Sequence, residues 1–419
     1  MSVPKLRFKE FDRDWQEVDI QTLVDERIID KPMDGNHGEI HPTSKDYVED
    51  GIPFVMATDV IDGIVHLDKS KKIKKSQADS LRKGFSLEGD ILLTHKATIG
   101  NVAKVPELKT PYIMLTPQVT YYRVLNKNKL TSDFIKSSFE SPIFQGELLA
   151  LCTGATRLYI GISEQRKLPF SYPSKEEQTK IANFLSAVDE KINQLSQKHS
   201  LLSQYKQGMM QKLFSQQIRF KADDGSEFGE WEEKKIGEIF QVTSGSTPLR
   251  SDERFFKHSE IFWVKTTDLN NGLITTTEEK ISKVALKETS IKVLPKGTVF
   301  VAMYGGFNQI GRTGLLTMES ACNQALSAIY PNELVNSYFL LTYLNFKVED
   351  WKNFAASSRK DPNITKSDVL AFPFILMSLE EQTKIANFLS AIDQKIEVVA
   401  QQIEQAKQWK KGLLQQMFV

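Results

Sequence analysis

The sequence predicts an α+β protein built twice on one plan, a β-rich domain followed by a long helix. The stretch EEQTKIANFLSA occurs at Glu176 and again, unchanged, at Glu380, and each copy opens a heptad pattern. Short β-type runs broken by Gly, Pro and Asn-Gly turns precede each copy. A chain of 419 residues also favours two domains over one. We therefore expect a tandem duplication.

The composition is that of an ordinary globular protein, with 40% hydrophobic and 26% charged residues. Cys152 and Cys322 offer neither a disulfide framework nor a metal cluster. No stretch is apolar enough for a signal peptide or a membrane span. These features predict a cytoplasmic location with no membrane partner. The net charge of +1 conceals a strongly basic segment between Lys69 and Lys83.

The likeness of the two halves extends beyond the repeated stretch. YKQGMMQKLF from Tyr205 matches WKKGLLQQMF from Trp409, and GIPFVMATDVIDGIV from Gly51 resembles EIFWVKTTDLNNGLI from Glu260 more weakly. Each half also begins with Arg-Phe-Lys shortly before a Trp, in LRFKEFDRDW and IRFKADDGSEFGEW. One portion has stayed nearly fixed while the other has diverged. This contrast indicates one shared task and one variable task.

Each fixed portion predicts a long amphipathic helix. Seam positions recur at steps of four and three from Ile181 to Leu213 and from Ile385 to Met417, as in a coiled coil. Ser174 and Ser378 are predicted to cap these helices reciprocally with the Glu three residues later. Helices of this length act as spacers or docking surfaces. The pattern leaves open whether they pair within one chain or between chains.

Matched surface residues on the two helices indicate one kind of partner for both. The alternative is that each helix simply packs on its own domain, but such packing would not by itself keep surface positions matched. A two-fold related partner would, because each helix would then present the same face to an identical subunit. The predicted docking residues are Gln178, Asn183 and Phe184 in the first helix, and Gln382, Asn387 and Phe388 in the second.

The diverged portions carry basic and polar loops that suit nucleic acid. Lys and Arg neutralise phosphates, while Asn, Gln and Arg can read base edges. Any one loop taken alone is better explained as solvated surface, and the prediction depends on the joint presence of such loops in both halves. The predicted DNA-contacting residues are Lys71, Lys72, Lys74, Lys75, His95, Lys96, Thr98 and Arg157 in the first half, and Ser244, Thr247, Arg250, Tyr304, Asn308, Gln309, Arg312, Ser358, Arg359 and Lys360 in the second.

Motifs of catalysis are poorly matched. Gly306 and Gly311 have phosphate-loop spacing, but Arg312 stands where Lys is needed and an apolar strand follows instead of a helix. His37 and His41 lie in a turn-rich loop and lack the Glu placement of a metalloprotease. No Pro-Pro-aromatic tetrapeptide of an adenine methyltransferase occurs. The sequence therefore predicts a protein without an active site or metal site of its own.

Two variable domains, each followed by a Pro, an EEQ and KIANFLSA(V/I)D and then a heptad helix, resemble the specificity subunit of type I restriction–modification systems. The resemblance covers essentially the whole chain. It implies two target recognition domains, 1–173 and 216–377, each reading one half of a bipartite, asymmetric site in double-stranded DNA. It also implies that helices 174–215 and 378–419 pair antiparallel with pseudo-two-fold symmetry, set the gap between half-sites and dock two modification subunits.

The resemblance further implies a non-catalytic subunit. S-adenosylmethionine, ATP and Mg²⁺ would act in partner modification and restriction/translocase subunits. The loops KPMDGNHGEIHPTSKDY and TSGSTPLRSDERFF differ in kind, so a shared contact geometry is not expected there. The alternative function is a scaffold or inhibitor of methyltransferase subunits that does not bind DNA. An inhibitor that mimics DNA would be strongly acidic, whereas this chain has 54 Lys and Arg against 53 Asp and Glu.

Overall fold

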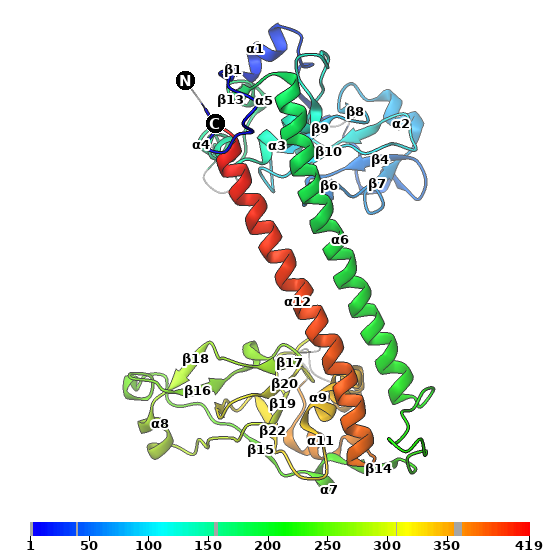
Figure 1. Ribbon diagram of the computed structural model, residues 1–419, viewed down its shortest axis with the longest axis vertical. Coiled ribbons are helices and arrows are strands. Elements are labelled where there is room, and N and C mark those ends of the chain that lie inside the picture. The colour runs from blue at the N-terminus through cyan, green and yellow to red at the C-terminus, as the bar shows by residue number, and fades with distance from the viewer. Residues whose placement is uncertain (1–2, 39–40, 155–157, 307, 356–362) are drawn as a thin grey trace. The chain divides into compact units, whose positions relative to one another are not determined.

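The computed structural model describes residues 3–38, 41–154, 158–306, 308–355 and 363–419. The chain divides into unit 1, which is Met1–Ser196 with Gln401–Val419, and unit 2, which is Gln197–Ala400. Two long helices, α6 (Lys175–Phe214) and α12 (Leu379–Met417), each contribute to both units (Figure 1). We call the part of unit 1 before α6 domain 1, and the part of unit 2 between α6 and α12 domain 2.

Domain 1 is built on two sheets and two short strand pairs, one of which is β5-β6. The sheets have the strand orders β10-β9-β12-β2 and β3-β7-β4-β11-β8, and β1 pairs with β13. The elements are β1 (Gln16–Asp19), α1 (Ile20–Asp25), β2 (Met33–Asp34), β3 (Tyr47–Val48), β4 (Ile52–Val55), β5 (Val60–Ile61), β6 (Ile64–Val65), β7 (Lys71–Ile73), α2 (Lys75–Ser80), β8 (Phe85–Ser86), β9 (Ile91–Thr94), β10 (Val102–Lys104), β11 (Ile113–Leu115), β12 (Val119–Tyr122), α3 (Ser132–Glu140), α4 (Pro142–Ala150), α5 (Ile162–Gln165) and β13 (Pro169–Tyr172).

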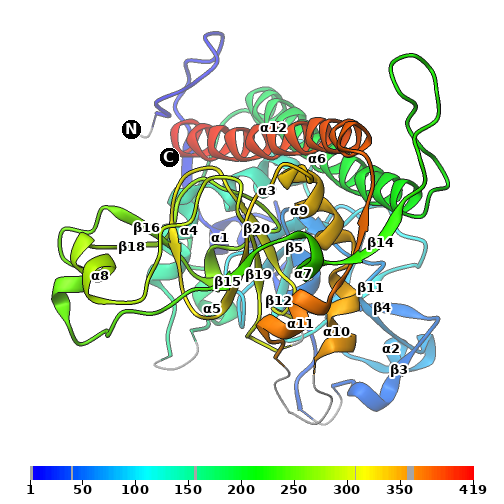
Figure 2. The same cartoon turned by 90° about the horizontal axis from the view of Figure 1, so that it is seen from below.

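Domain 2 repeats this plan with sheets β15-β22-β19-β20-β17 and β18-β16-β21 and the strand pair β14-β23. The lobe of β16, β18 and α8 lies away from α9 and α11 in both views (Figure 1, Figure 2). The elements are β14 (Glu232–Lys235), α7 (Ile236–Ile239), β15 (Val242–Ser244), β16 (Ile261–Val264), β17 (Gly272–Ile274), β18 (Glu279–Ile281), α8 (Lys283–Glu288), β19 (Val299–Ala302), β20 (Thr313–Leu316), β21 (Ala321–Cys322), β22 (Leu326–Ile329), α9 (Ser337–Phe346), α10 (Trp351–Phe354), α11 (Lys366–Ala371) and β23 (Pro373–Leu376).

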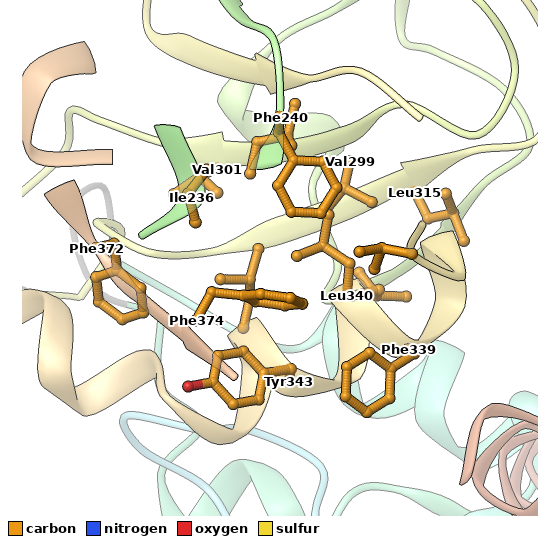
Figure 3. Close-up of a cluster of buried hydrophobic side chains, with 14 of the residues drawn as sticks. Ile236, Phe240, Val299, Val301, Leu315, Phe339, Leu340, Tyr343, Phe372 and Phe374 are labelled. Atoms are coloured by element: carbon orange, nitrogen blue, oxygen red, sulfur yellow. The ribbon is translucent and has the colours of Figure 1, made fainter. Parts of the chain in front are cut away.

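The fold class predicted from the sequence is confirmed, and several predicted runs are its central strands. ILLT and VTYY form β9 and β12, and VFVA forms β19, all fully buried. The helical stretch expected near Asn336 is α9, where the Asn336 side chain accepts the N–H groups of Tyr338 and Phe339 at 2.9 and 3.1 Å. Figure 3 shows Phe339 and Tyr343 of α9 facing β19 in the core of domain 2.

Strand register makes the two domains comparable residue by residue. Asp34 pairs with Thr120 in domain 1, and Ser244 pairs with Ser327 at the same place in domain 2. Thr94 pairs with Val119 in domain 1, as Ala302 pairs with Leu326 in domain 2. The loops that follow β2 and β15 therefore start at equivalent positions of the two sheets. The backbone framework is therefore shared up to Asp34 and Ser244, while the side chains of the loops that follow differ.

Within each unit the start of one long helix packs against the end of the other, so the pairing is antiparallel and within the chain. In unit 1, Ile181 and Leu185 of α6 share a core with Leu413 of α12. In unit 2, Ile385 of α12 shares a core with Leu213 of α6. The seam predicted from the heptads is the less exposed side of both helices.

The two lysines at predicted seam positions are explained by ion pairs between the helices. Lys206 Nζ of α6 lies 2.6 Å from Asp393 Oδ1 of α12 in unit 2. Lys410 Nζ of α12 lies 2.7 Å from Asp189 Oδ1 of α6 in unit 1. Asp189 and Asp393 are the aspartates of the repeated SAVD and SAID stretches. A polar pair at one seam position fixes the register of a coiled coil, and here it is duplicated.

The capping prediction is half right. Ser174 Oγ accepts the Glu177 N–H at 3.4 Å, and Ser378 Oγ accepts the Glu381 N–H at 3.3 Å. The glutamate carboxylates, however, bind arginines far away in the sequence. Glu177 accepts from Arg7 at 2.7 and 2.8 Å, and it lies 3.4 Å from the indole N–H of Trp15.

Domain 2 repeats this arrangement. Glu381 accepts from Arg219 at 3.0 and 2.8 Å and from the Trp231 indole at 2.9 Å. The duplicated Arg-Phe-Lys and Trp segments therefore fasten the start of each half to the first turn of its long helix. We call each Arg–Glu–Trp set a helix clamp. None of the helices in the described part of the chain has an apolar stretch fit to cross a bilayer.

Candidate nucleic-acid interface

Loops converge at one edge of the first sheet of each domain. In domain 1, β2 and β9 both run antiparallel to β12, so they run parallel to each other and end at the same edge. The segments Gly35–His37 and His95–Thr98 follow these two strands. In domain 2, β15 and β19 have the same relation to β22. We call these places the loop edges, and several of the predicted contact residues lie on or beneath them.

A glycine sets the close approach of the first loop in both domains. A Cβ atom on Gly35 would lie 1.8 Å from the Leu115 carbonyl oxygen, and one on Gly245 would lie 2.1 Å from the Cys322 carbonyl oxygen. The backbone can therefore pass there only without a side chain. These glycines bring the residues that follow them to the loop edge.

The loop edge of domain 1 carries charged side chains that sequence reasoning missed. Asp34 is 4% exposed, lies 2.7 Å from His37 Nε2 through one oxygen and binds Lys83 through the other. Burial raises the pKa of Asp34, but the hydrogen bonds from Lys83 and His37 outweigh it and make the net shift downward. Lys96, which was predicted, is exposed beside them. This edge combines a fixed carboxylate with exposed cationic and imidazole groups.

His95 lies under the edge rather than on it. Its Nδ1 is 2.8 Å from the Thr120 hydroxyl, and its side chain is buried. Burial lowers the pKa of His95 to about 4, so the ring is neutral at physiological pH. The predicted DNA contact of His95 is therefore corrected to a supporting role beneath Lys96 and Thr98.

The loop edge of domain 2 offers a different set of side chains. Met303 replaces His95, and its sulfur lies 3.0 Å from the hydroxyl of Ser327, the counterpart of Thr120. Tyr304 is 44% exposed. Arg312 has no ion-pair partner among the residues that the structure describes, which leaves its guanidinium available to an anion or a base edge.

The remaining predicted residues of this edge share the same loops. Asn308 is exposed and Gln309 partly so, and Ser244 is exposed at the end of β15. The exposed Thr247 hydroxyl binds the side chain of Gln324, a residue that the sequence did not single out. Hydroxyl, amide, phenol and guanidinium groups therefore gather at one edge.

The basic segment of domain 1 lies on its second sheet. Lys71 and Lys72 belong to β7, Lys74 immediately precedes α2, and Lys75 pairs with Asp79 at 2.6 Å. These residues form a cationic strip separate from the loop edge, which we call the basic strip.

In the corresponding lobe of domain 2, basic side chains pair with acidic ones. Arg250 lies 2.6 Å from Glu279 and 5.2 Å from the Trp263 ring centroid. Arg250 and Lys265 lower the pKa of Glu279 to about 2. The predicted Arg157, Ser358, Arg359 and Lys360 lie outside the described residues.

The predicted docking residues divide into buried and exposed ones. Gln178 is fully buried: its amide donates to Lys129 and Pro173 carbonyls, both at 2.9 Å, and its oxygen accepts the Thr131 N–H at 3.1 Å. Gln382 is fully buried with an equivalent set of three bonds. Their predicted contact with a partner is corrected, because each ties its own domain to its helix.

The exposed docking residues remain available to a partner. Asn183 and Asn387 are exposed, whereas Phe184 and Phe388 are partly covered by Phe8 and Phe220 at 6.0 and 5.7 Å between ring centroids. Throughout the ranges that the structure describes, no three His, Cys, Asp or Glu side chains gather as a metal site would require.

Comparisons with known proteins bear on both halves of the chain. A family model described as the type I restriction modification DNA specificity domain matches residues 31–202 and 229–408. The chain is 26% identical to the type I restriction enzyme MjaIX specificity subunit of Methanocaldococcus jannaschii over 63% of this chain and 61% of that protein. It is 23% identical to the putative MjaX specificity subunit of the same organism, over 98% of this chain and 94% of that protein.

A solved structure shares the fold along the whole length. The crystal structure of a type I restriction–modification system S subunit from M. genitalium aligns with a TM-score of 0.60 and 17% identity, and it covers 100% of this chain and 99% of that one. The two-domain architecture with paired long helices is therefore one that an experimental structure also has.

Proposed function

The chain belongs to the family of type I restriction modification DNA specificity domains, and on that premise we propose that it is the subunit that gives a type I restriction–modification complex its DNA sequence specificity. Each domain reads one half of a bipartite, asymmetric site. The helices set the gap between the two halves.

One observation carries the proposal: the two domains present different chemistry on the same framework. The edge of domain 1 holds Asp34, His37 and Lys96, whereas that of domain 2 holds Thr247 and Arg312 among its polar groups. Groups of these kinds bind base edges and phosphates. A duplicated frame with unlike edges suits two unlike half-sites. A scaffold that never touched DNA would have no use for this difference.

We propose that the helices dock two modification subunits through their exposed, repeated faces. Asn183 and Asn387 stand one residue before a phenylalanine in the same heptad context and face solvent. The partly buried ion pairs between the helices and the fully buried Gln178 and Gln382 would hold this face rigid. S-adenosylmethionine, ATP and Mg²⁺ would bind to the modification and restriction/translocase subunits, and this chain would perform no chemistry itself.

Domain exchange tests the proposal. Residues 1–170 are replaced by the corresponding domain of a relative, and methylated adenines are mapped across the genome of a host that also expresses the cognate modification subunit. We expect a bipartite motif in which one half-site changes while the other half-site and the gap are retained. The control host expresses the modification subunit alone.

Two results would contradict the proposal. A change in both half-sites would show that the domains do not read separately. A stable complex that adds no new motif would favour the non-DNA-binding scaffold instead.

A further inference from the structure

His37 occupies at the loop edge of domain 1 the position that Thr247 occupies in domain 2. Both residues come two positions after the glycine that passes against the neighbouring strand backbone. Both are exposed, and the His37 side chain retains 58% of its accessible surface. Thr247 is among the residues that the sequence predicts to contact DNA, whereas His37 is not.

The His37 ring is held by one of its two nitrogens. Its partner Asp34 is buried, ionised and also bound to Lys83. An ionised carboxylate only accepts hydrogen bonds, so His37 Nε2 carries the proton in the 2.7 Å contact. Nδ1 has no hydrogen-bond partner among the residues that the structure describes.

This arrangement differs from that of an ordinary surface histidine, whose ring turns freely. A buried carboxylate, itself fixed by a lysine and by the strand pairing of Asp34 with Thr120, sets the orientation of an exposed ring. Reading a base edge requires a polar atom held in place with one bond still to make. Nδ1 meets this requirement, and exposed Lys96 on the adjacent loop can meet a phosphate.

We propose that His37 is a specificity-determining residue of domain 1 that contacts a base edge through Nδ1, with Asp34 and Lys83 as positioning residues. In the neutral ring Nδ1 accepts a hydrogen bond, and the major-groove donors are the amino groups of adenine and cytosine. His37 therefore favours a base pair that presents such an amino group. The inference rests on the proposed function of the chain.

The test compares wild type with H37A and T247A, each as the full chain coexpressed with the cognate modification subunit. Adenine-methylation mapping gives the motif, and competition binding with duplexes varied at single positions gives the preference. We expect H37A to weaken the preference at one base pair of one half-site roughly tenfold, which corresponds to about 1.4 kcal/mol. The other half-site and the gap stay unchanged. T247A is expected to alter the opposite half-site.

Two further variants complete the test. D34N keeps a side chain of similar shape but removes the negative charge that holds His37. It is therefore expected to weaken the preference at the same base pair by a smaller factor. K127A changes an exposed lysine of domain 1 in the loop after β12 and is expected to leave the motif intact.

The outcomes separate the two proposals. An intact wild-type motif that H37A does not alter, or that it weakens equally in both half-sites, overturns the role of His37. A wild-type complex that methylates no bipartite motif contradicts the proposed function itself.

Discussion

His95 and Met303 show how one buried position supports two different edges. Each backbone N–H donates to a carbonyl just before the neighbouring strand, that of Gln118 before β12 at 2.9 Å or that of Ala325 before β22 at 2.8 Å. Each side chain meets a hydroxyl, that of Thr120 or that of Ser327. The position therefore supports the loop above it, with an imidazole in domain 1 and a thioether in domain 2.

The His95 ring makes domain 1 sensitive to acid. Below pH 6.5 the unfolded side chain takes up a proton that the folded one does not accept until about pH 4. The free energy of unfolding should therefore fall as the pH falls from 6.5 to 4, by about 2 kcal/mol at pH 5. Urea unfolding of the full chain at a series of pH values measures this loss.

H95M is the matched control, because Met fills the same position in domain 2. The variant should lose the acid sensitivity that belongs to the imidazole and keep that of the remaining groups. Parallel pH profiles for wild type and H95M would show that burial of His95 does not oppose its protonation.

Sequence reasoning found many residues of the loop edges but placed some of them wrongly. Residue type identified Lys96, Thr247 and Arg312, because cations and hydroxyls between strand runs mark polar loops. It could not distinguish exposed Lys96 from buried His95, since a turn residue faces in or out according to tertiary packing. The two glycines offered an unused signal: aligning MDGNH with TSGST on its Gly brings His37 opposite Thr247.

At the scale of elements, the repeated helix residues serve two purposes that look alike in sequence. One set, including Glu177 and Gln178, is buried and fastens a domain to its helix. The other, including Asn183, faces solvent. A heptad pattern predicts the seam between the helices, but the domain packs on another side of the helix where no period reveals it. Repetition alone therefore overestimated the docking surface.

The buried glutamines should be energetically important. Q382A leaves the Asn336 N–H and the Leu334 and Met377 carbonyls without the partners that they have at 2.9, 3.0 and 2.9 Å. Unsatisfied buried groups of this kind destabilise by about 2 to 3 kcal/mol. Urea unfolding of the full chain should show this loss, and Q178A should cost a similar amount through domain 1.

Q394A provides the comparison for the glutamine prediction. Gln394 lies on the exposed side of the same helix, and its replacement should change the free energy of unfolding by less than about 0.5 kcal/mol. Equal effects of Q382A and Q394A would mean that the buried hydrogen bonds contribute nothing beyond helix propensity.

The helix clamps illustrate what the sequence contained and what it concealed. The repeated Arg-Phe-Lys and Trp segments were visible, as was the repeated EEQ. Nothing local connects Arg7 with Glu177, because a pair so distant in the sequence is set by the tertiary fold. The local capping rule therefore gave Glu177 a nearby partner, whereas the carboxylate binds the guanidinium of Arg7.

At the scale of the whole molecule, charge is balanced and cannot by itself attract DNA. With 54 Lys and Arg against 53 Asp and Glu, the long-range attraction of an overall positive charge is missing. Local groups must supply the attraction to phosphates. The basic strip of Lys71, Lys72, Lys74 and Lys75 is such a group, whereas the equivalent strand of domain 2 keeps Lys280 but carries Glu279, paired with Arg250, in place of Lys71. The electrostatic contribution to binding should therefore come unequally from the two domains.

Charge reversal on the basic strip tests this inequality. K74E/K75E should weaken DNA binding by the complex and reduce the slope of log affinity against log salt by about one, because each phosphate that a lysine neutralises adds about 0.9 to the steepness of that slope. Lys74 is exposed, whereas Lys75 already pairs with Asp79, so most of the change should come from Lys74. K31E/K127E makes the same change in net charge on exposed residues of the same domain. If the control variant lowers the slope as much as K74E/K75E, net charge governs binding; if neither changes it, the basic strip does not contact the phosphates.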